Sequence, residues 1–407
     1  MLLVGAINFS IDPYDVFGSR RIAGIDLYKP ATKNHMMLSK TYQVSRVRPV
    51  TVIVGASKVL IGLDANSRSW PASMRPIYNY GVPGTGIRSN FETVQEAYHA
   101  GRLKYVVAVL DFEAFLAPDG PGPSEAERRF SLREDGSRNP EQPWQVLADS
   151  ALALFTLGTF EDSLSTVVGQ YDRPALDLRR DGSSTEAEFA RAARWDGYHV
   201  LFAQKEMDIR DTVKKGQKRL ADWQGPLPNM DELARMLSFC RAHHIAVTLV
   251  LAPIHADALE MYWNAGLWPR VEQWKLELTQ LAQRMASSPI PVWDFMEYDR
   301  YAIERVPGPG DRESVTSWFW EPHHFKKSLG ELIIRRLMGG GPSDFGTMLS
   351  TANIARQNAA VRAQQAEYHC AQTGARMPGE DRLGDETCAA APVRFVPVSE
   401  STKGAQQ

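Results

Sequence analysis

A buried strand that runs directly into a tight turn constrains the fold of this chain more than any other stretch. Residues 51–54 read Thr-Val-Ile-Val, and Gly55-Ala56-Ser57 follows at once. A short run of β-branched apolar residues bounded by glycine is typical of a strand inside a sheet. In open α/β sheets, ligands bind beyond the carboxyl ends of the strands. Ser57 therefore lies where a functional side chain is expected.

The same alternation of strand and helix recurs along the chain. Because a strand, a helix and a second strand in succession favour parallel pairing with helices on both faces, we predict a three-layer α/β/α fold. Its mainly parallel sheet has five strands. The four further strands are expected at 77–81, 105–110, 245–251 and 290–293, and the helices around them at 87–98, 231–240, 267–286 and 328–337.

The chain divides into three regions. We expect residues 1–50 to be an approach segment, residues 51–340 to be the α/β domain, and residues 341–407 to be a tail that is helical to about residue 369 and then low in order. A mostly helical insertion at about 113–230 interrupts the domain and is expected to pack over the rim of the sheet. The alternative is a helical subdomain with no contact to any site. Helices in this insertion are expected at 144–157, 160–170, 185–194 and 198–223.

The two ends of the chain bear on its cellular location. Residues 1–7 are apolar but far too short to cross a bilayer, and they lack the basic region and cleavage site of a signal peptide. They fit the end of a membrane anchor whose start is missing, a short buried strand, or a frayed terminus. In the tail, a disulfide between Cys370 and Cys388 is expected only in an oxidising compartment, and two free thiols are the alternative.

Several functional classes are excluded by composition and spacing. The net charge of −2 supplies no basic field for nucleic acid. The glycines at 81–86 lack both the phosphate-loop lysine and the dinucleotide fingerprint. His243-His244 has no nearby ligand set and is expected to be a solvated helix end, so no metal or cofactor is predicted. Three tryptophans either pack in the core, which is the favoured interpretation, or form a sugar platform: Trp263, Trp268 and Trp274.

A candidate base for Ser57 lies far downstream. Serine is a weak nucleophile until a base takes its proton, and that base needs a third group to fix its tautomer. Glu321 and His324 have a spacing that lets the acid orient one imidazole nitrogen and leave the other free. Both follow the fifth strand and precede the last helix, at the carboxyl edge of the sheet. The alternatives are that Ser57 is only a helix cap, and that Asp294 replaces Glu321.

Six groups of residues together resemble a known family: Asp12-Pro13-Tyr14; Val54 to Lys58 with Gly62-Leu63-Asp64; Asn79 with Gly84; Pro253-Ile254-His255; Trp293-Asp294-Phe295; and Glu321 to Phe325. The pattern, which covers about residues 10–340, resembles the SGNH/GDSL hydrolase superfamily. In that superfamily a Ser follows the first strand, and Asp-x-x-His precedes the last helix of a flavodoxin-like sheet. More narrowly, the chain looks like the SGNH-like proteins of bacterial exopolysaccharide gene clusters and is distantly similar to the alginate O-acetylation proteins.

The resemblance implies a role for each of these residues. Ser57 would be the nucleophile, His324 the general base and Glu321 the orienting acid. The Ser57 backbone N–H and the Gly84 region would form the oxyanion hole, since preorganised backbone donors give large rate effects. The candidates for oxyanion or substrate contacts are Gly84, Asn79, Lys58 and His255.

The chain departs from the family pattern at two places. The acid of the family is usually Asp, whereas this chain has Glu321. The family also has an oxyanion-hole Asn after the third strand, whereas this chain reads Asp111-Phe112-Glu113. A carboxylate at that place repels an oxyanion unless it is protonated or turned away.

The function that the resemblance implies is a serine acyl-ester hydrolase or O-acyltransferase. Its substrate would be the acetyl groups of an extracytoplasmic polysaccharide, and its location periplasmic or membrane-anchored facing the periplasm. The expected partners are an acylated carbohydrate or polysaccharide and exopolysaccharide assembly proteins. Two alternatives stay open: a catalytically degenerate SGNH fold that binds or assembles polysaccharide, and a cytoplasmic small-molecule esterase.

Overall fold

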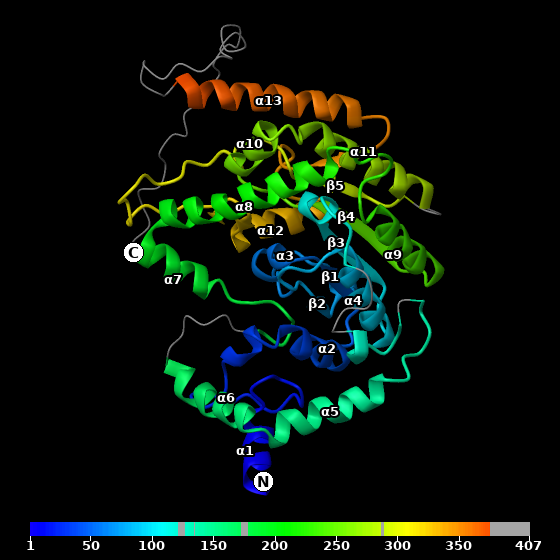
Figure 1. Ribbon diagram of the computed structural model, residues 1–407, viewed down its shortest axis with the longest axis vertical. Helices are drawn as coiled ribbons and strands as arrows, with labels where there is room; N and C mark the ends of the chain where they lie inside the picture. Colours follow the sequence, from blue (N-terminus) through cyan, green and yellow to red (C-terminus); the bar gives the residue numbers. More distant parts are fainter. Residues whose placement is uncertain (121–126, 134, 172–177, 286–288, 375–407) are drawn as a thin grey trace.

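A six-stranded sheet forms the centre of the molecule (Figure 1). The computed structural model describes residues 1–120, 127–133, 135–171, 178–285 and 289–374. The strand order is β2-β1-β3-β4-β5-β8, and the first five strands are parallel. The strands are β1 Thr51–Val54, β2 Ile77–Asn79, β3 Tyr105–Leu110, β4 Ala246–Leu251, β5 Val292–Asp294 and β8 Thr347–Leu349. The order 2-1-3-4-5 is that of flavodoxin-like sheets, so the predicted fold class is confirmed.

The sheet has one strand more than the five predicted. Strand β8 pairs antiparallel with β5 at the edge of the sheet. It has only three residues and follows a glycine-rich segment, so it carries no recognisable alternation. A separate antiparallel hairpin is formed by β6 Phe319–Glu321 and β7 His324–Phe325.

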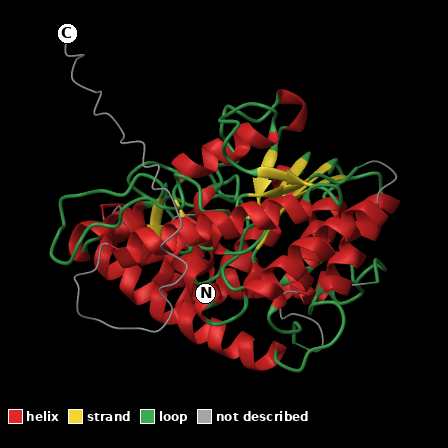
Figure 2. Cartoon of the chain, turned by 90° about the horizontal axis from the view of Figure 1, so that it is seen from above, coloured by secondary structure: helices red, strands yellow, loops and turns green. Residues whose placement is uncertain are grey.

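Helices cover both faces of the sheet (Figures 1 and 2). Successive side chains of a strand point to opposite faces, so strands covered on both sides are apolar throughout. In β1, Val52 belongs to the core cluster on one face of the sheet, whereas Ile53 belongs to the cluster on the other face. The helices are α1 Leu2–Ile11, α2 Met36–Val47, α3 Ser57–Gly62, α4 Ile87–His99, α5 Gln142–Phe155, α6 Leu157–Val168, α7 Ala187–Asp196, α8 Tyr198–Leu220, α9 Met230–Ala242, α10 Ala256–Asn264, α11 Trp268–Met285, α12 Lys327–Leu337 and α13 Ile354–Gly374.

The insertion between β3 and α9 is split between two places. Helices α5 and α6 lie with α1 at the end of the molecule opposite α13 (Figure 1). Helices α7 and α8 instead pack against the β6–β7 hairpin. Across the described residues, no helix by itself has the length and apolar composition to cross a membrane, although α5 and α6, bent by 61° at their junction, meet that test as a pair.

The cysteines and tryptophans bear on two predictions. Cys240 is a buried free thiol in α9, as predicted. Cys370 in α13 is disulfide-bonded, but its expected partner Cys388 lies outside the described residues, so that pairing stays a prediction. Trp268 and Trp274 are buried in the main core, which confirms the core interpretation for these two side chains.

Candidate active site

The turn after β1 places Ser57 at the start of α3. Gly55 has φ +151°, and a Cβ at this position would lie 2.8 Å from the carbonyl oxygen of Val109. Only glycine fits such a close backbone approach. The strand therefore ends abruptly, and the side chain of Ser57 stands at the carboxyl edge of the sheet, half-buried.

Ser57, His324 and Glu321 form one hydrogen-bonded chain. The Nε2 atom of His324 lies 2.7 Å from the Oγ atom of Ser57. The Nδ1 atom of the same ring contacts Oε1 of Glu321. The other carboxylate oxygen of Glu321 accepts the backbone N–H of His323 at 3.1 Å. The three side chains that the sequence paired are thus brought together in the order nucleophile, base and acid.

Glu321 is ionised in this setting. Its burial acts to raise the pKa of the carboxyl, but the charge and hydrogen bond of His324 outweigh burial, so the pKa lies below its usual value. A buried carboxylate can hold the imidazole in one tautomer and stabilise the imidazolium that forms when the base takes a proton. The contact with His324 also shows that Glu321, although one methylene longer than the usual Asp, reaches the imidazole.

A carboxylate that the sequence did not single out fixes the hairpin that carries Glu321 and His324. Glu304 accepts the backbone N–H groups of three successive residues, Ser317, Trp318 and Phe319, at 2.7, 2.9 and 2.7 Å. These bonds hold the start of β6 in place. Glu304 lies in a loop without a periodic pattern, so nothing in the sequence marked it.

Two glycines let the hairpin approach α3 closely. A Cβ on Gly62 would lie 2.2 Å from the ring of Phe325, and a Cβ on Gly330 would lie 1.8 Å from the carbonyl oxygen of Gly62. Any larger residue at either position would push β7 or α12 away from α3. Because Phe325 follows His324 directly, this packing keeps the imidazole within reach of Ser57.

Helices α7 and α8 form one wall of the site. The ring of Phe189 in α7 lies 5.4 Å from the ring of His324, measured between centroids. Tyr198, the first residue of α8, stacks on Trp320 of β6 with an angle of 9° between the rings. The Lys326 ammonium lies 4.3 Å from the Trp320 ring centroid and donates to the hydroxyl of Tyr198 at 2.8 Å. The alternative of an insertion without contact to the site is therefore wrong for α7 and α8.

A second polar cluster adjoins the three residues, at the place where the family has an Asn. Asp111 is paired with the ammonium of Lys58 at 2.5 Å, so its charge is compensated. Burial raises the pKa of Glu113 to about 7, against the opposing charge of Lys58. His323 lies 3.3 Å from Glu113, and burial lowers the pKa of its imidazole well below the usual value, which leaves it neutral. The charge of Asp111 is thus balanced by Lys58, and the raised pKa of Glu113 lets part of its population be protonated near neutral pH.

Asn79 and His255 turn out to be structural. The amide nitrogen of Asn79 donates to the carbonyls of Val59 and Leu63 at 2.7 and 2.8 Å, deep in the core. The Nε2 atom of His255 lies 2.8 Å from the carbonyl oxygen of Glu304, and its Nδ1 accepts the N–H of Asp257. Both side chains are buried and bonded to backbone. They therefore stabilise the backbone around them and do not make the substrate contacts that we predicted.

Gly84 lies on the turn that follows β2, next to the end of β1. Its φ is +75° and it is exposed. In the same turn, the N–H of Val82 donates to the carbonyl of Gly55 at 3.1 Å, which ties the turn to the strand end before Ser57. Asp294 is fully buried and paired with Lys275 at 2.6 Å. It is therefore not the acid that orients His324.

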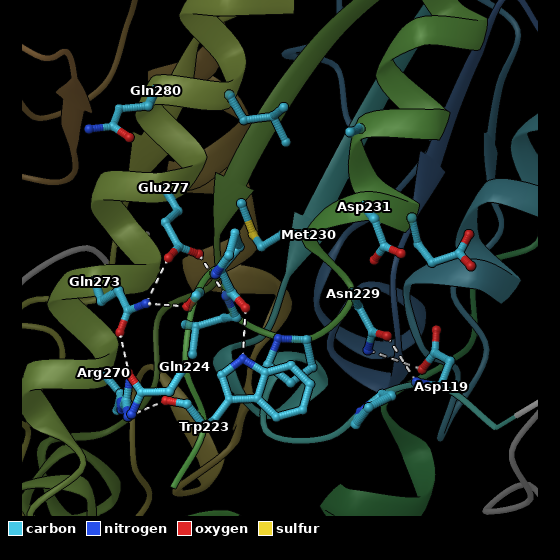
Figure 3. A pocket seen from close by; sticks show the side chains of 18 of the residues that line it. Asp119, Trp223, Gln224, Asn229, Met230, Asp231, Arg270, Gln273, Glu277 and Gln280 are labelled. Atoms are coloured by element: carbon cyan, nitrogen blue, oxygen red, sulfur yellow. Dashed lines mark hydrogen bonds between the residues drawn. The ribbon is translucent and has the colours of Figure 1, made fainter. Parts of the chain in front are cut away.

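A groove of about 1010 Å³ lies beside α9 and α11 (Figure 3). Ser57, Glu321 and His324 do not line it, so the groove is distinct from the site that these three residues form. Figure 3 shows Gln280, Glu277, Gln273 and Arg270 along one side, Asp231, Asn229 and Asp119 along the other, and Trp223 between them. Within the described ranges, no cluster of His, Cys, Asp and Glu suits a metal ion, and His243-His244 is exposed.

Two comparisons with known proteins bear on the identity of this chain. No family model matches the chain, and no curated protein matches it at a significant level. The geometry of the site is therefore the main ground for assigning a function.

Proposed function

We propose that the protein is a serine-dependent acyl-ester hydrolase or O-acyltransferase of the SGNH type. The observation that carries this proposal is the bonded chain from Ser57 Oγ to His324 Nε2 and from His324 Nδ1 to Glu321. Such a chain activates a hydroxyl for attack on an acyl carbonyl, and its order is that of serine hydrolases on unrelated folds.

The reaction would proceed in two halves. Ser57 attacks the acyl carbonyl while His324 takes its proton, and His324 then gives the proton to the departing alkoxide. This leaves an acyl-Ser57 ester. Water or a sugar hydroxyl, deprotonated by His324, attacks that ester. His324 then returns the proton to the Ser57 oxygen as the acyl–oxygen bond breaks, which releases the acid or the new ester. Glu321 stays ionised throughout and balances the charge on the imidazolium.

The negative charge of the tetrahedral intermediate would be met by backbone donors. Ser57 begins α3, and the first N–H groups of a helix have no acceptor within that helix. Together with the turn at Gly84 they offer the donors that an oxyanion needs. Lys58 supports this role because it pairs with Asp111, the carboxylate that would otherwise repel the oxyanion.

For the substrate, we propose acetyl groups on an extracytoplasmic polysaccharide. The groove supports a carbohydrate, because it combines an aromatic ring at Trp223 with amides and charged groups, side chains that suit a chain of hydroxyls. Arg88 lines the groove and lies at the start of α4, directly after the turn that contains Gly84, so the groove reaches the edge of the sheet where Ser57 stands. The disulfide at Cys370 supports an oxidising compartment.

Turnover of acetyl esters tests the proposal. Purified protein should release p-nitrophenol from p-nitrophenyl acetate, and Ser57→Ala should abolish that release. Adding an unacetylated polysaccharide should move acetyl groups onto it if the enzyme is a transferase, and acetylated polysaccharide should lose acetate if it is a hydrolase. Absence of all three activities would favour the degenerate, polysaccharide-binding alternative.

A further inference from the structure

Helix α6 has its polar and apolar sides reversed relative to a helix on the surface of a water-soluble protein. In water, such a helix turns its apolar stripe toward the core. Here the buried residues are Thr159, Ser163 and Thr166. The exposed large apolar side chains of the helix are Leu157 at 73%, Leu164 at 50%, Val167 at 36% and Val168 at 75%.

Helices α1 and α5 show the same reversal. In α5 the buried residues are Asp149 and Ala153, and in α1 they are Gly5 and Asn8. The exposed large apolar side chains are Trp144, Leu147, Leu152 and Phe155 of α5, and Leu2, Leu3 and Phe9 of α1. Among the described residues, more than half of the exposed large apolar side chains belong to α1, α5 and α6 or to Met1 before them. We refer to these three helices as the base of the molecule, a structural name that is unrelated to the general base His324.

Polar contacts inside the base hold it in this orientation. The amide of Asn8 donates to the carbonyl of Leu154 at 2.9 Å, and the hydroxyl of Ser163 donates to the Oδ1 atom of Asn8 at 2.9 Å. Gly5 lies against the ring of Phe155, where a Cβ would be 2.9 Å from the nearest ring carbon. The exposure of the apolar side chains is therefore a consequence of specific packing.

Helices in lipid pack with small and polar residues at the contacts between them, and they expose large apolar residues on the outside. An exposed apolar surface of this extent marks an interaction site. The α5–α6 pair also has the length and composition of a membrane-embedded segment, although it is bent. Helix α1 projects from the body at the same end (Figure 1). These observations agree on a lipid environment better than on water.

We propose that the base docks on a lipid bilayer, with α5 and α6 lying in the interfacial region and the amino-terminal end of α1 entering it. The exposed Trp144 at the start of α5 suits the boundary between lipid and water, where aromatic rings are enriched. This proposal is independent of the reaction at Ser57.

Vesicle flotation tests the proposal with the full chain. The protein should float with phosphatidylcholine vesicles, with or without phosphatidylglycerol. The double variant Leu147→Glu, Leu164→Glu should float at least about tenfold less, because charges oppose burial in the interface. The matched control is Met207→Glu on α8, which changes a side chain that is 63% exposed but lies outside the base, and it should float as the unchanged protein does.

Circular dichroism should give the same spectrum for all three proteins, since the substituted side chains are exposed. Equal flotation of the double variant and the unchanged protein would overturn the proposal. So would absence of flotation with both kinds of vesicle. Self-association of the unchanged protein without vesicle binding, lost in the double variant, would show that a second copy covers the base instead.

Discussion

The two halves of the helical insertion face in opposite directions. Helices α7 and α8 turn aromatic side chains inward, where Phe189 meets the ring of His324 and Tyr198 stacks on Trp320. Helices α5 and α6 turn small and polar side chains inward and apolar ones outward. One half lines the site around Ser57 and His324, and the other forms a surface. Amphipathic periodicity therefore predicts a helix, but it does not predict which face of that helix packs against the rest of the protein.

The largest expected effect is on kcat/KM and comes from a substitution in the site beside α7 and α8. Glu321→Gln should lower kcat/KM for an acetyl ester by about 10⁴-fold, because an amide holds the wrong tautomer and does not balance the imidazolium. The matched control is Asp162→Asn in α6, which removes a carboxylate from the base and should leave kcat/KM unchanged. Steady-state kinetics of both variants measures this difference. An equal loss of activity in the two variants would contradict the separate roles of the two halves.

Asn8 tests whether the base is held by its polar contacts. Asn8→Ala leaves the carbonyl of Leu154 and the hydroxyl of Ser163 without their partner inside the base, which should cost about 1–3 kcal/mol in the free energy of unfolding. Denaturant unfolding measures this loss. Ser10→Ala is the matched control, because Ser10 lies in the same helix but is exposed, and its hydroxyl donates to the carbonyl of Ala6 within that helix. An equal effect of the two substitutions would contradict specific packing of the base.

Phe189 sharpens the contrast between the two halves. Phe189→Ala should lower kcat/KM about tenfold, because the lost ring contact, of the order of 1 kcal/mol, frees the imidazole of His324 to move. Leu164→Ala removes a comparable apolar side chain from the base and should leave kcat/KM unchanged. A loss confined to Leu164→Ala would reverse the roles that we assign to the two halves.

The smallest expected effect is on pH dependence. The pKa of Glu113 is about 7 in the native protein, so a negative charge appears beside the site as pH rises through 7, and kcat/KM should decline a few-fold. Glu113→Gln should remove that decline. Glu96→Gln is the matched control, because burial also raises the pKa of Glu96 to about 7 while its carboxylate bonds to Ser131, away from the site. A decline that survives in Glu113→Gln would assign it to another group.

The same two carboxyls should affect stability in one direction. Each has a native pKa of about 7, above the 4.5 of a model carboxyl, so each binds its proton more tightly in the native protein. Their contribution to the free energy of unfolding is present below pH 4.5 and is lost as pH rises to about 7. Either substitution should flatten that loss in thermal unfolding. An unchanged pH profile in both variants would contradict the raised pKa values.

The sheet and the bonded group of Ser57, His324 and Glu321 were predictable because each leaves a local pattern. The strand before Ser57 is a continuous apolar run, and Glu321 and His324 are three positions apart. Strands that are parallel meet at one edge, so these short signals also predicted that the residues lie near one another. The exact partner of each oxygen still depended on packing at Gly62 and Gly330.

Other features were not predictable because their signals are not local. The pairing of Lys58 with Asp111 joins residues 53 positions apart, and it changes the charge that an oxyanion meets. The bonds from Glu304 to three backbone N–H groups follow from a loop conformation. The reversed faces of α5 and α6 required knowing which side the body of the protein occupies. Asn79 and His255 were assigned to the substrate because the resemblance does not distinguish a side chain that stabilises the backbone from one that contacts a substrate.

Covalent labelling shows whether His324 activates Ser57. A fluorophosphonate probe should modify the protein at Ser57, as located by mass spectrometry of the labelled peptide. His324→Ala should abolish that labelling while the circular dichroism spectrum stays unchanged. No modification of Ser57 in the unchanged protein, or equal modification in His324→Ala, would contradict the account.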